Sequence, residues 1–285
     1  MSGFSPRRGE YPEGGRGDSF LGTMAARSRQ RADDTARTRS LSERREKVLS
    51  GSRPRPLGTF GEVFDIIAEV KPRSPSEGAF PERHPAETAM GYQAGGAGMI
   101  SVLTEPSEFG GSIEMLEAVA AVVSVPVLAK DFLVDPIQVY EAREAGADGV
   151  LVIARILSDE AMVEILDAVA EIGAFALLEA FDGDDLKRIR RAVSRRENLI
   201  AGVNCRDLDT LDAVPERHAA LGGQLPGGVV SVAESAMQVP GDIERVATYG
   251  YRAALIGSAL MRADDPGRLV SDMVAAGRRA VTVPS

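Results

Sequence analysis

The stretch VPVLAKDFLVDPIQVYEAREAGADGVLVI, residues 125–153, contains two apolar runs separated by a helical pattern. PVLAK and GVLVI have the length of strands, and PIQVYEAREAG between them has apolar residues at helical spacing. A strand, a helix and a second strand of these lengths are typical of a βα unit with parallel strands. The apolar runs are continuous rather than alternating, so we expect strands that are covered by helices on their outer side.

The same arrangement recurs along the chain. Apolar runs of strand length begin near residues 65, 99, 126, 149, 174, 199, 229 and 253, with helical patterns between them. QAGGAGMISVL, EAGADGVLVI and TYGYRAALIG each place a Gly at the end of a helix, then a small spacer and a strand. Eight such units predict a (β/α)₈ barrel of the α/β class. An open doubly wound sheet is the alternative, but the even spacing and the lack of G-x-G-x-x-G favour the barrel.

Three segments are expected. Residues 1–20 are rich in Gly, Pro, Ser, Arg and Glu, which predicts a disordered leader. Residues 21–57 read as an N-terminal extension of one or two polar helices that ends at SRPRPLG. Residues 58–285 hold the eight units and are expected to form the barrel.

Charge and composition exclude several classes of protein. The net charge of −9 is uneven, because residues 1–57 carry 13 basic and 7 acidic side chains while the rest is acidic. The acidic body argues against nucleic acid as a partner. The Arg-rich leader is either a solvated or weakly helical extension, or a segment that binds a polyanion. No apolar run is long enough to span a membrane, no secretory signal is visible, and the single Cys fits a reducing compartment, so we expect a cytoplasmic protein.

Lysine is rare in this chain. It has 29 Arg but only four Lys, at 47, 71, 130 and 187. A desolvated Lys can lose its proton near neutral pH, whereas Arg cannot, so a retained Lys is a candidate for chemistry. Lys47 and Lys187 lie in polar helical patterns, while Lys71 and Lys130 end predicted strands.

In a (β/α)₈ barrel the carboxyl ends of the strands meet at one mouth. The residues at these ends, in chain order, are Glu69, Lys71, Lys130, Glu179, Asn204, Arg206, Glu234, Ser235, Gly257 and Ser258. Carboxylates and ammonium groups in a partly desolvated cup shift each other's pKa, so that one can act as acid and another as base. The small residues of ESAM and IGSAL suit a phosphate cradle. The sequence therefore predicts a site for an anionic, phosphorylated small molecule.

Six strings resemble the indole-3-glycerol-phosphate synthase family: IIAEVKPRSPSEG, ISVLTEPSEFGGS, VPVLAKDFLVDPIQVYEAREAGADGVLVI, GVNCRDLDTL, VAESAM and LIGSALMRADDPG. They occur in order, each at its own strand end, over about residues 60–268. The resemblance implies a monomeric lyase of tryptophan biosynthesis that uses neither metal nor organic cofactor. Its substrate would be 1-(2-carboxyphenylamino)-1-deoxyribulose 5-phosphate, which undergoes ring closure, decarboxylation and dehydration.

The resemblance also implies a role for each matching residue. Lys130 would be the general acid and Glu179 the general base, while Lys71 would neutralise the substrate carboxylate; which lysine donates in which step stays open. Glu69 and Asn204 would orient the two lysines and the developing hydroxyl. The implied substrate-binding residues are Arg206 for the carboxylate, Glu234 and Ser235 for the pocket wall, Ser74, Ala236, Gly257 and Ser258 for the phosphate, and Pro75, Phe109, Phe132 and Leu208 for the aromatic ring.

The chain departs from the family pattern at three places. Ala236 stands where the family usually has Gly, which is unfavourable if the backbone there needs positive φ. Cys205 is expected to be a small buried thiol, and Glu77 replaces a position that is often basic. These departures leave open a paralogue of a secondary-metabolite pathway and a catalytically silent phosphate-binding barrel. The pathway's isomerase is a further alternative, although it would need a Cys and Asp pair at other strand ends. His84 and His218 are expected to be exposed and without function.

Overall fold

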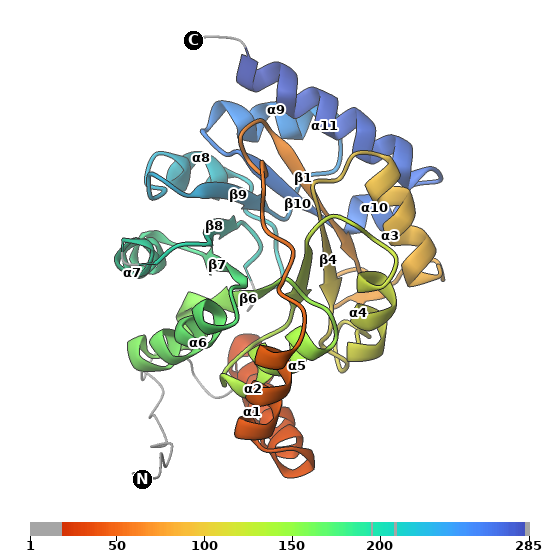
Figure 1. The fold of residues 1–285 in the computed structure, drawn as a ribbon. Coiled ribbons are helices and arrows are strands. Elements are labelled where there is room, and N and C mark those ends of the chain that lie inside the picture. Colours follow the sequence, from red (N-terminus) through yellow and green to blue (C-terminus); the bar gives the residue numbers. More distant parts are fainter. Residues whose placement is uncertain (1–18, 195, 208–209, 283–285) are drawn as a thin grey trace.

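A computed structural model describes residues 19–194, 196–207 and 210–282 of the chain. Eight parallel strands close into a barrel in the order β1-β10-β9-β8-β7-β6-β5-β4 (Figure 1). These strands are β1 (Asp65–Val70), β4 (Met99–Leu103), β5 (Val127–Lys130), β6 (Gly149–Ile153), β7 (Phe175–Ala180), β8 (Leu199–Asn204), β9 (Val230–Glu234) and β10 (Ala253–Ile256). Each begins within one residue of its predicted position, which confirms the (β/α)₈ barrel and excludes the open sheet.

The strands are apolar because both of their faces are buried. Every residue of β1, β4, β6, β7, β8 and β10 is buried. One face of each strand packs inside the barrel, and the other packs under the helices. These strands therefore have no exposed polar face, as their continuous apolar sequences predicted.

Helices cover the outside of the barrel. They are α3 (Pro85–Ala94), α4 (Ile113–Ala120), α5 (Ile137–Glu144), α6 (Asp159–Glu171), α7 (Gly183–Val193), α8 (Glu216–Gly222), α9 (Pro240–Thr248), α10 (Ser258–Arg262) and α11 (Pro266–Thr282), with a short 3₁₀ turn at Ala154–Ile156. In α6, Ser158 caps the first turn by accepting a hydrogen bond from Ala161 N, and Ile165 is fully buried against the strands. No helix in the described part of the chain is long and apolar enough to cross a membrane.

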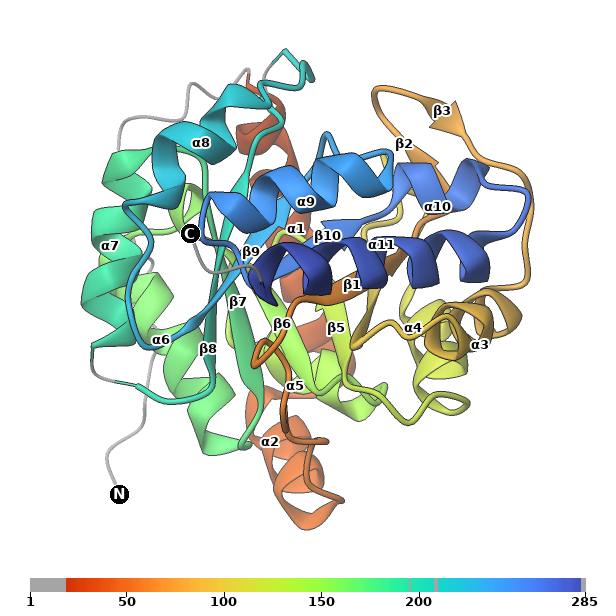
Figure 2. The same cartoon turned by 90° about the horizontal axis from the view of Figure 1, so that it is seen from above.

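A small hairpin projects from the end of the barrel where the strands terminate (Figure 2). It consists of β2 (Arg73–Ser74) and β3 (Gly78–Ala79), which pair antiparallel directly after β1. Arg73 N donates to Phe109 O at 3.2 Å, which ties the hairpin to the loop after β4. The hairpin therefore belongs to the same face as the predicted site.

Two N-terminal helices, α1 (Phe20–Thr38) and α2 (Leu41–Ser50), lie against the barrel beside α5. Their cations pair with carboxylates of the barrel in a set that we call the arginine strap: Arg27–Glu108, Arg29–Asp135, Arg31–Asp131, Arg39–Glu144, Arg44–Glu144 and Arg45–Glu171. The Arg-rich extension is thus helical over Phe20–Thr38 and Leu41–Ser50, and acidic side chains of the barrel bind its cations. The proposed leader, residues 1–20, lies outside the described residues apart from Ser19 and Phe20, and the boundary at residue 57 stays a proposal.

The opposite end of the barrel holds a buried carboxylate with many partners. Asp148 precedes β6 and is 1% exposed. It accepts hydrogen bonds from the backbone N–H of Arg55 at 2.7 Å and of Val127 at 2.9 Å. It also pairs with the guanidinium groups of Arg55 at 2.7 Å and Arg143 at 3.3 Å. Asp148 thus fastens the segment between α2 and β1 to the base of the barrel.

Candidate active site

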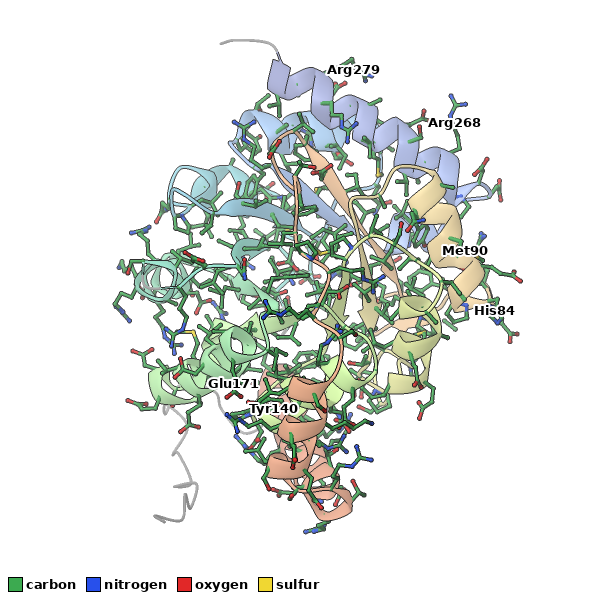
Figure 3. All side chains as sticks on the ribbon, in the orientation of Figure 1. His84, Met90, Tyr140, Glu171, Arg268 and Arg279 are labelled. Carbon is green, nitrogen blue, oxygen red and sulfur yellow. The ribbon has the colours of Figure 1, made fainter. Side chains whose placement is uncertain are left out.

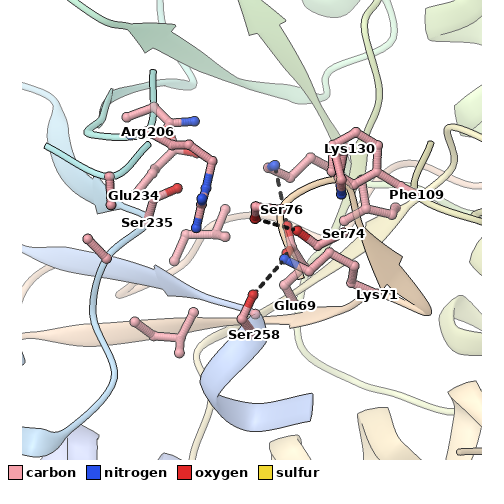
Figure 4. Close-up of a pocket in the computed structure, with 18 of the residues that line it drawn as sticks. Glu69, Lys71, Ser74, Ser76, Phe109, Lys130, Arg206, Glu234, Ser235 and Ser258 are labelled. Atoms are coloured by element: carbon pink, nitrogen blue, oxygen red, sulfur yellow. Dashed lines mark hydrogen bonds and ion pairs between the residues drawn. The ribbon is translucent and has the colours of Figure 1, made fainter. Parts of the chain in front are cut away.

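A cavity of about 320 Å³ opens at the carboxyl ends of the strands (Figure 4). Every residue that the sequence predicted for the site lines this cavity, except Leu208, which lies outside the described residues. In Figure 4, Arg206, Glu234 and Ser235 face Lys130, Phe109 and Ser74 across the opening. The barrel therefore brings together side chains that are up to about 190 positions apart in the sequence, as the convergence of parallel strands requires.

Glu69 holds both candidate lysines at the floor of the cavity. Its Oε1 lies 3.1 Å from Lys71 Nζ and its Oε2 lies 3.3 Å from Lys130 Nζ. The Glu69 side chain is 3% exposed, so the two ammonium groups share one buried carboxylate. The prediction that Glu69 orients Lys71 and Lys130 matches this geometry.

The two lysines have pKa values shifted in opposite directions. Burial lowers the pKa of Lys71, and the neighbouring cations Lys130 and Arg206 add to this effect, against the attraction of Glu69. Burial acts in the same sense on Lys130, but Glu69, Glu179 and Glu234 outweigh it and raise its pKa. The same two lysines lower the pKa of Glu69 although its burial opposes the shift. Lys130 is therefore a lasting cation, and Lys71 is the more acidic of the pair.

Two further carboxylates, those of Glu179 and Glu234, are buried side by side on β7 and β9. Glu179 and Glu234 are each only 1% exposed. Asn204 Nδ2 donates to Glu179 Oε2 at 3.3 Å, so Asn204 holds the carboxylate of Glu179 in place. Apart from the hydrogen bond that the two carboxyl groups share, Glu179 Oε1 and both oxygens of Glu234 have no hydrogen-bond partner in the described part of the chain.

Burial dominates the titration of this pair. It raises the pKa of Glu179, although Lys130 and the Asn204 hydrogen bond oppose the shift. It raises the pKa of Glu234 well above its ordinary value, and repulsion from Glu179 adds to this. Glu234 therefore holds its proton to higher pH than Glu179, which leaves Glu179 as the member that ionises and can act as a base.

Two glycines create the room that these carboxylates occupy. A Cβ on Gly202 of β8 would lie 2.2 Å from Glu234 Oε1, and a Cβ on Gly257 would lie 2.2 Å from Glu69 Oε1. Neither glycine has positive φ, so space rather than backbone conformation requires them. We expected Gly257 to bind phosphate and did not predict a role for Gly202. The space that a glycine leaves beside a carboxylate depends on the three-dimensional structure.

The loops after β1, β9 and β10 carry the residues that were predicted to bind phosphate. Lys71 Nζ donates to Ser258 Oγ at 3.3 Å, and Ser74 and Ser76 form a hydrogen bond of 3.0 Å. Ser76 was missed by the sequence reasoning, although it is the second Ser of the same Ser-Pro-Ser turn. Ser235 and Ala236 have φ of 70° and 58°, so the backbone has positive φ where the family usually has Gly. A methyl group there is strained, at a cost of about 1–2 kcal/mol.

The aromatic wall is continuous with the N-terminal helices. The ring centroids of Phe109 and Phe132 are 6.1 Å apart, and Phe20 of α1 packs edge-on against Phe132 at 6.2 Å. Arg27 of α1 donates to Ser107 at 2.9 Å, next to Phe109. The extension thus supports the loops that carry the predicted aromatic residues, a role that no local sequence pattern indicated.

Three side chains outside the proposed chemistry have clear environments. Cys205 is buried, as expected, and burial raises the pKa of its thiol to about 11, which leaves it unreactive. His84 is exposed at the start of α3 (Figure 3). The expectation that His218 is exposed is wrong: it is 2% exposed, its Nε2 lies 3.1 Å from Glu234 O, and its ring packs against Tyr251. Burial lowers the pKa of His218, so it is neutral and supports β9.

Within the described residues, no group of three or more His, Cys, Asp or Glu side chains is arranged to hold a metal ion. The groups that line the cavity include two ammonium groups, three buried carboxyl groups and a guanidinium beside an apolar wall. This set can protonate an oxygen, accept a proton and hold a polyanion.

Comparisons with known proteins agree with this geometry. Residues 32–273 match the family described as indole-3-glycerol phosphate synthase. The chain is 40% identical over 252 residues to the indole-3-glycerol phosphate synthase of Mycobacterium avium, covering 87% of this chain and 91% of that protein. It is 45% identical over 213 residues to the one from Kineococcus radiotolerans, covering 74% and 76%.

Solved structures show the same fold at low identity. The crystal structure of 3-hexulose-6-phosphate synthase from Salmonella typhimurium has a TM-score of 0.60 and 15% identity, covering 76% of this chain and 100% of that one. This likeness supports the barrel alone. The match over residues 32–273, the relatives at about 40% identity and the site geometry together show that the chain belongs to the indole-3-glycerol phosphate synthase family.

Proposed function

We propose that the protein converts 1-(2-carboxyphenylamino)-1-deoxyribulose 5-phosphate to indole-3-glycerol phosphate, CO₂ and water, in tryptophan biosynthesis. One observation carries the proposal: Lys71 and Lys130 share Glu69 in the same cavity as a buried Glu179. Acid, base and anion-binding groups thus surround a space lined by aromatic side chains.

The first half of the reaction requires positive charge at the substrate carbonyl. The ring carbon that bears the carboxylate attacks this carbonyl, whose oxygen takes a proton from Lys130. The new carbon–carbon bond is followed by loss of CO₂, whose bonding electrons restore the aromatic ring. Lys71 and Arg206 hold the substrate carboxylate before it leaves.

The second half requires an acid at the hydroxyl and a base at the nitrogen. Glu179 accepts the proton from nitrogen, and a lysine gives a proton to the hydroxyl, which leaves as water. A proton then moves from the ring CH₂ to nitrogen, which restores the aromatic ring and gives the indole. The lowered pKa of Lys71 supports Lys71 as this donor, since it releases a proton more readily than Lys130. Asn204 keeps the Glu179 carboxylate in place through its hydrogen bond.

The remaining roles follow the same division of the cavity. The phosphate binds at Ser74, Ala236, Gly257 and Ser258, and the aromatic ring binds at Pro75, Phe109, Phe132 and Leu208. We further expect a cytoplasmic monomer without a nucleic-acid partner, in keeping with a family of biosynthetic enzymes. Light scattering of the purified protein measures the oligomeric state.

Fluorescence tests the proposed function directly. The chain contains no Trp, so indole emission from the product stands out against the protein. We expect turnover by the wild-type protein and losses of about 10²-fold or more for Lys130→Ala and Glu179→Gln. Lys187→Ala, at an exposed lysine on α7, is the matched control and should keep full activity. Binding without turnover by the wild-type protein would instead identify a catalytically silent barrel.

A further inference from the structure

Glu77 lies in the turn between β2 and β3, at the mouth of the cavity. Its backbone N–H donates to Ser74 O at 3.2 Å, and Phe80 N donates to Pro72 O at 2.9 Å, so the hairpin has a defined shape. Glu77 also lines the cavity. Its carboxylate is therefore held at the entrance used by a negatively charged substrate.

Two arginines from different strand-end loops face this carboxylate. Arg262, at the end of α10, pairs with Glu77 Oε2, and Arg206, after β8, has its second terminal nitrogen 3.9 Å from Glu77 Oε1. The side chains of Glu77 and Arg206 are 21% and 23% exposed, and that of Arg262 is 42% exposed. Partly exposed pairs of this kind contribute little to stability. Because the three side chains lie at the mouth of the cavity, their ion pairs can instead affect the binding of an anionic substrate.

Arg206 is otherwise fixed by its own loop. One terminal nitrogen donates to Leu211 O at 2.7 Å, and its backbone N–H donates to Asn204 Oδ1 at 2.8 Å. These contacts orient the guanidinium so that the other terminal nitrogen points to Glu77. The separation of 3.9 Å is too long for a hydrogen bond but short enough for the two opposite charges to attract each other. The cation that is proposed to bind the substrate carboxylate thus already faces a carboxylate of the protein.

We propose that Glu77 is a built-in competitor for the anionic substrate at Arg206, and that Arg262 restrains it. Arg262 draws the Glu77 carboxylate outward, and the incoming substrate carboxylate takes its place beside Arg206. Glu77 thereby lowers the affinity for the anionic substrate without taking part in the chemistry. This inference rests on the proposed function through the assignment of Arg206.

A double-mutant cycle distinguishes competition from a general effect of charge at the mouth. Glu77→Gln should lower the KM about 3- to 10-fold with little change in kcat, because the competing charge is gone. Arg262→Gln should raise the KM, since Glu77 then pairs with Arg206 alone. In the Glu77→Gln background, Arg262→Gln should leave the KM unchanged, because Arg262 acts only through Glu77.

The control is Glu82→Gln, which removes the same charge from an exposed loop position outside the cavity. It should leave the KM unchanged. Equal effects of Glu77→Gln and Glu82→Gln, or the same effect of Arg262→Gln in both backgrounds, would overturn the inference in favour of a general field.

Calorimetric binding of 2-aminobenzoate, an aromatic carboxylate that is not turned over, separates this inference from the proposed function. Tighter binding by Glu77→Gln than by wild type supports competition even if no product forms. Unchanged binding of this probe, together with unchanged KM, overturns the role of Glu77 and leaves the proposed function standing.

Discussion

The two ends of the barrel treat buried carboxylates in opposite ways. At the base, Asp148 is 1% exposed and is surrounded by two backbone N–H groups and two guanidinium groups. At the mouth, Glu234 is equally buried, yet its only hydrogen bond in the described part of the chain is with the neighbouring carboxyl group of Glu179. The base uses its carboxylate to hold the fold, whereas the mouth keeps carboxylates that cost stability and remain available for a ligand.

The arginine strap resembles the base, because it also uses ion pairs to hold segments of the fold together. Arg44, for example, is 8% exposed and pairs with Glu144 at 2.8 Å. At the mouth, three carboxyl groups crowd around two lysines, and burial together with these neighbouring charges shifts their pKa values. The strap and the base surround each carboxylate with several cations, which holds the fold, while the desolvated carboxyl groups of the mouth are poised for chemistry.

Among substitutions of small residues, the largest effect is expected where a methyl group displaces the carboxylate that holds both lysines. In Gly257→Ala the new Cβ would lie 2.2 Å from Glu69 Oε1 and 3.1 Å from Lys71 Nζ. We expect kcat to fall about 10²-fold, because a displacement of about 1 Å at catalytic groups has this effect. Gly241→Ala in α9, where nothing lies within 4 Å, is the control and should be fully active. Full activity of Gly257→Ala would show that Glu69 does not position the lysines.

At the base, Asp148→Asn should destabilise the fold without changing the chemistry. The amide replaces one acceptor oxygen by a donor, so Arg55 and Arg143 lose a buried partner. We expect the free energy of unfolding to fall by about 3–5 kcal/mol in urea, with kcat unchanged. Asp184→Asn, whose side chain is 87% exposed on α7, should leave stability unchanged. An Asp148→Asn protein that is as stable as wild type would show that Asp148 does not stabilise the base of the barrel.

At the mouth, Glu234→Gln should increase stability in a pH-dependent way. The pKa of Glu234 is raised in the folded state. Below the ordinary carboxyl pKa the protonated side chain contributes its full share to the free energy of unfolding, and this share is lost as pH rises towards the raised pKa of the folded protein. The variant should therefore gain about 1–3 kcal/mol over wild type between pH 5 and pH 8, measured by urea unfolding. Exposed Glu164→Gln on α6 should show no such trend. If the difference in unfolding free energy between Glu234→Gln and wild type shrinks as pH rises, the pKa of Glu234 is not raised in the folded protein.

The smallest effect concerns Ala236, whose φ is 58°. Glycine adopts this conformation without strain, so Ala236→Gly should stabilise the protein by about 0.5–1 kcal/mol after the entropy of the unfolded chain is counted. Ala219→Gly in the exposed face of α8 reverses the sign and should destabilise by about 1 kcal/mol. Thermal unfolding of both variants checks the pair, and destabilisation by Ala236→Gly would show that the methyl group is not strained.

Much of the mouth could be predicted from the sequence, because strand ends are readable from apolar runs and meet in any parallel barrel. This is why Glu69, Lys130 and Glu179 were predicted together despite their separation along the chain. The base and the strap could not be predicted in this way. The ion pair between Arg44 and Glu144 joins residues 100 positions apart, with no local pattern that relates them.

The errors have the same origin. His218 lies in a polar stretch that predicted exposure, yet α8 turns this side chain inward onto Tyr251. The hydrogen bond between Asn204 and Glu179 was likewise not predicted, because it depends on how β8 lies beside β7. In both cases the neighbour is set by the packing of a whole element, which the residue's own surroundings in the sequence do not specify.

The most direct test of the contrast measures turnover and unfolding on the same preparations of two variants, Glu179→Gln at the mouth and Asp148→Asn at the base. We predict that Glu179→Gln loses about 10²- to 10⁴-fold in kcat and is at least as stable as wild type, because burial raises the pKa of Glu179 and the neutral amide avoids that cost. Asp148→Asn should keep its kcat and lose about 3–5 kcal/mol of unfolding free energy. Loss of stability in Glu179→Gln to the same degree as in Asp148→Asn, or loss of turnover in both, would contradict the division of the barrel into a stabilising base and a reactive mouth.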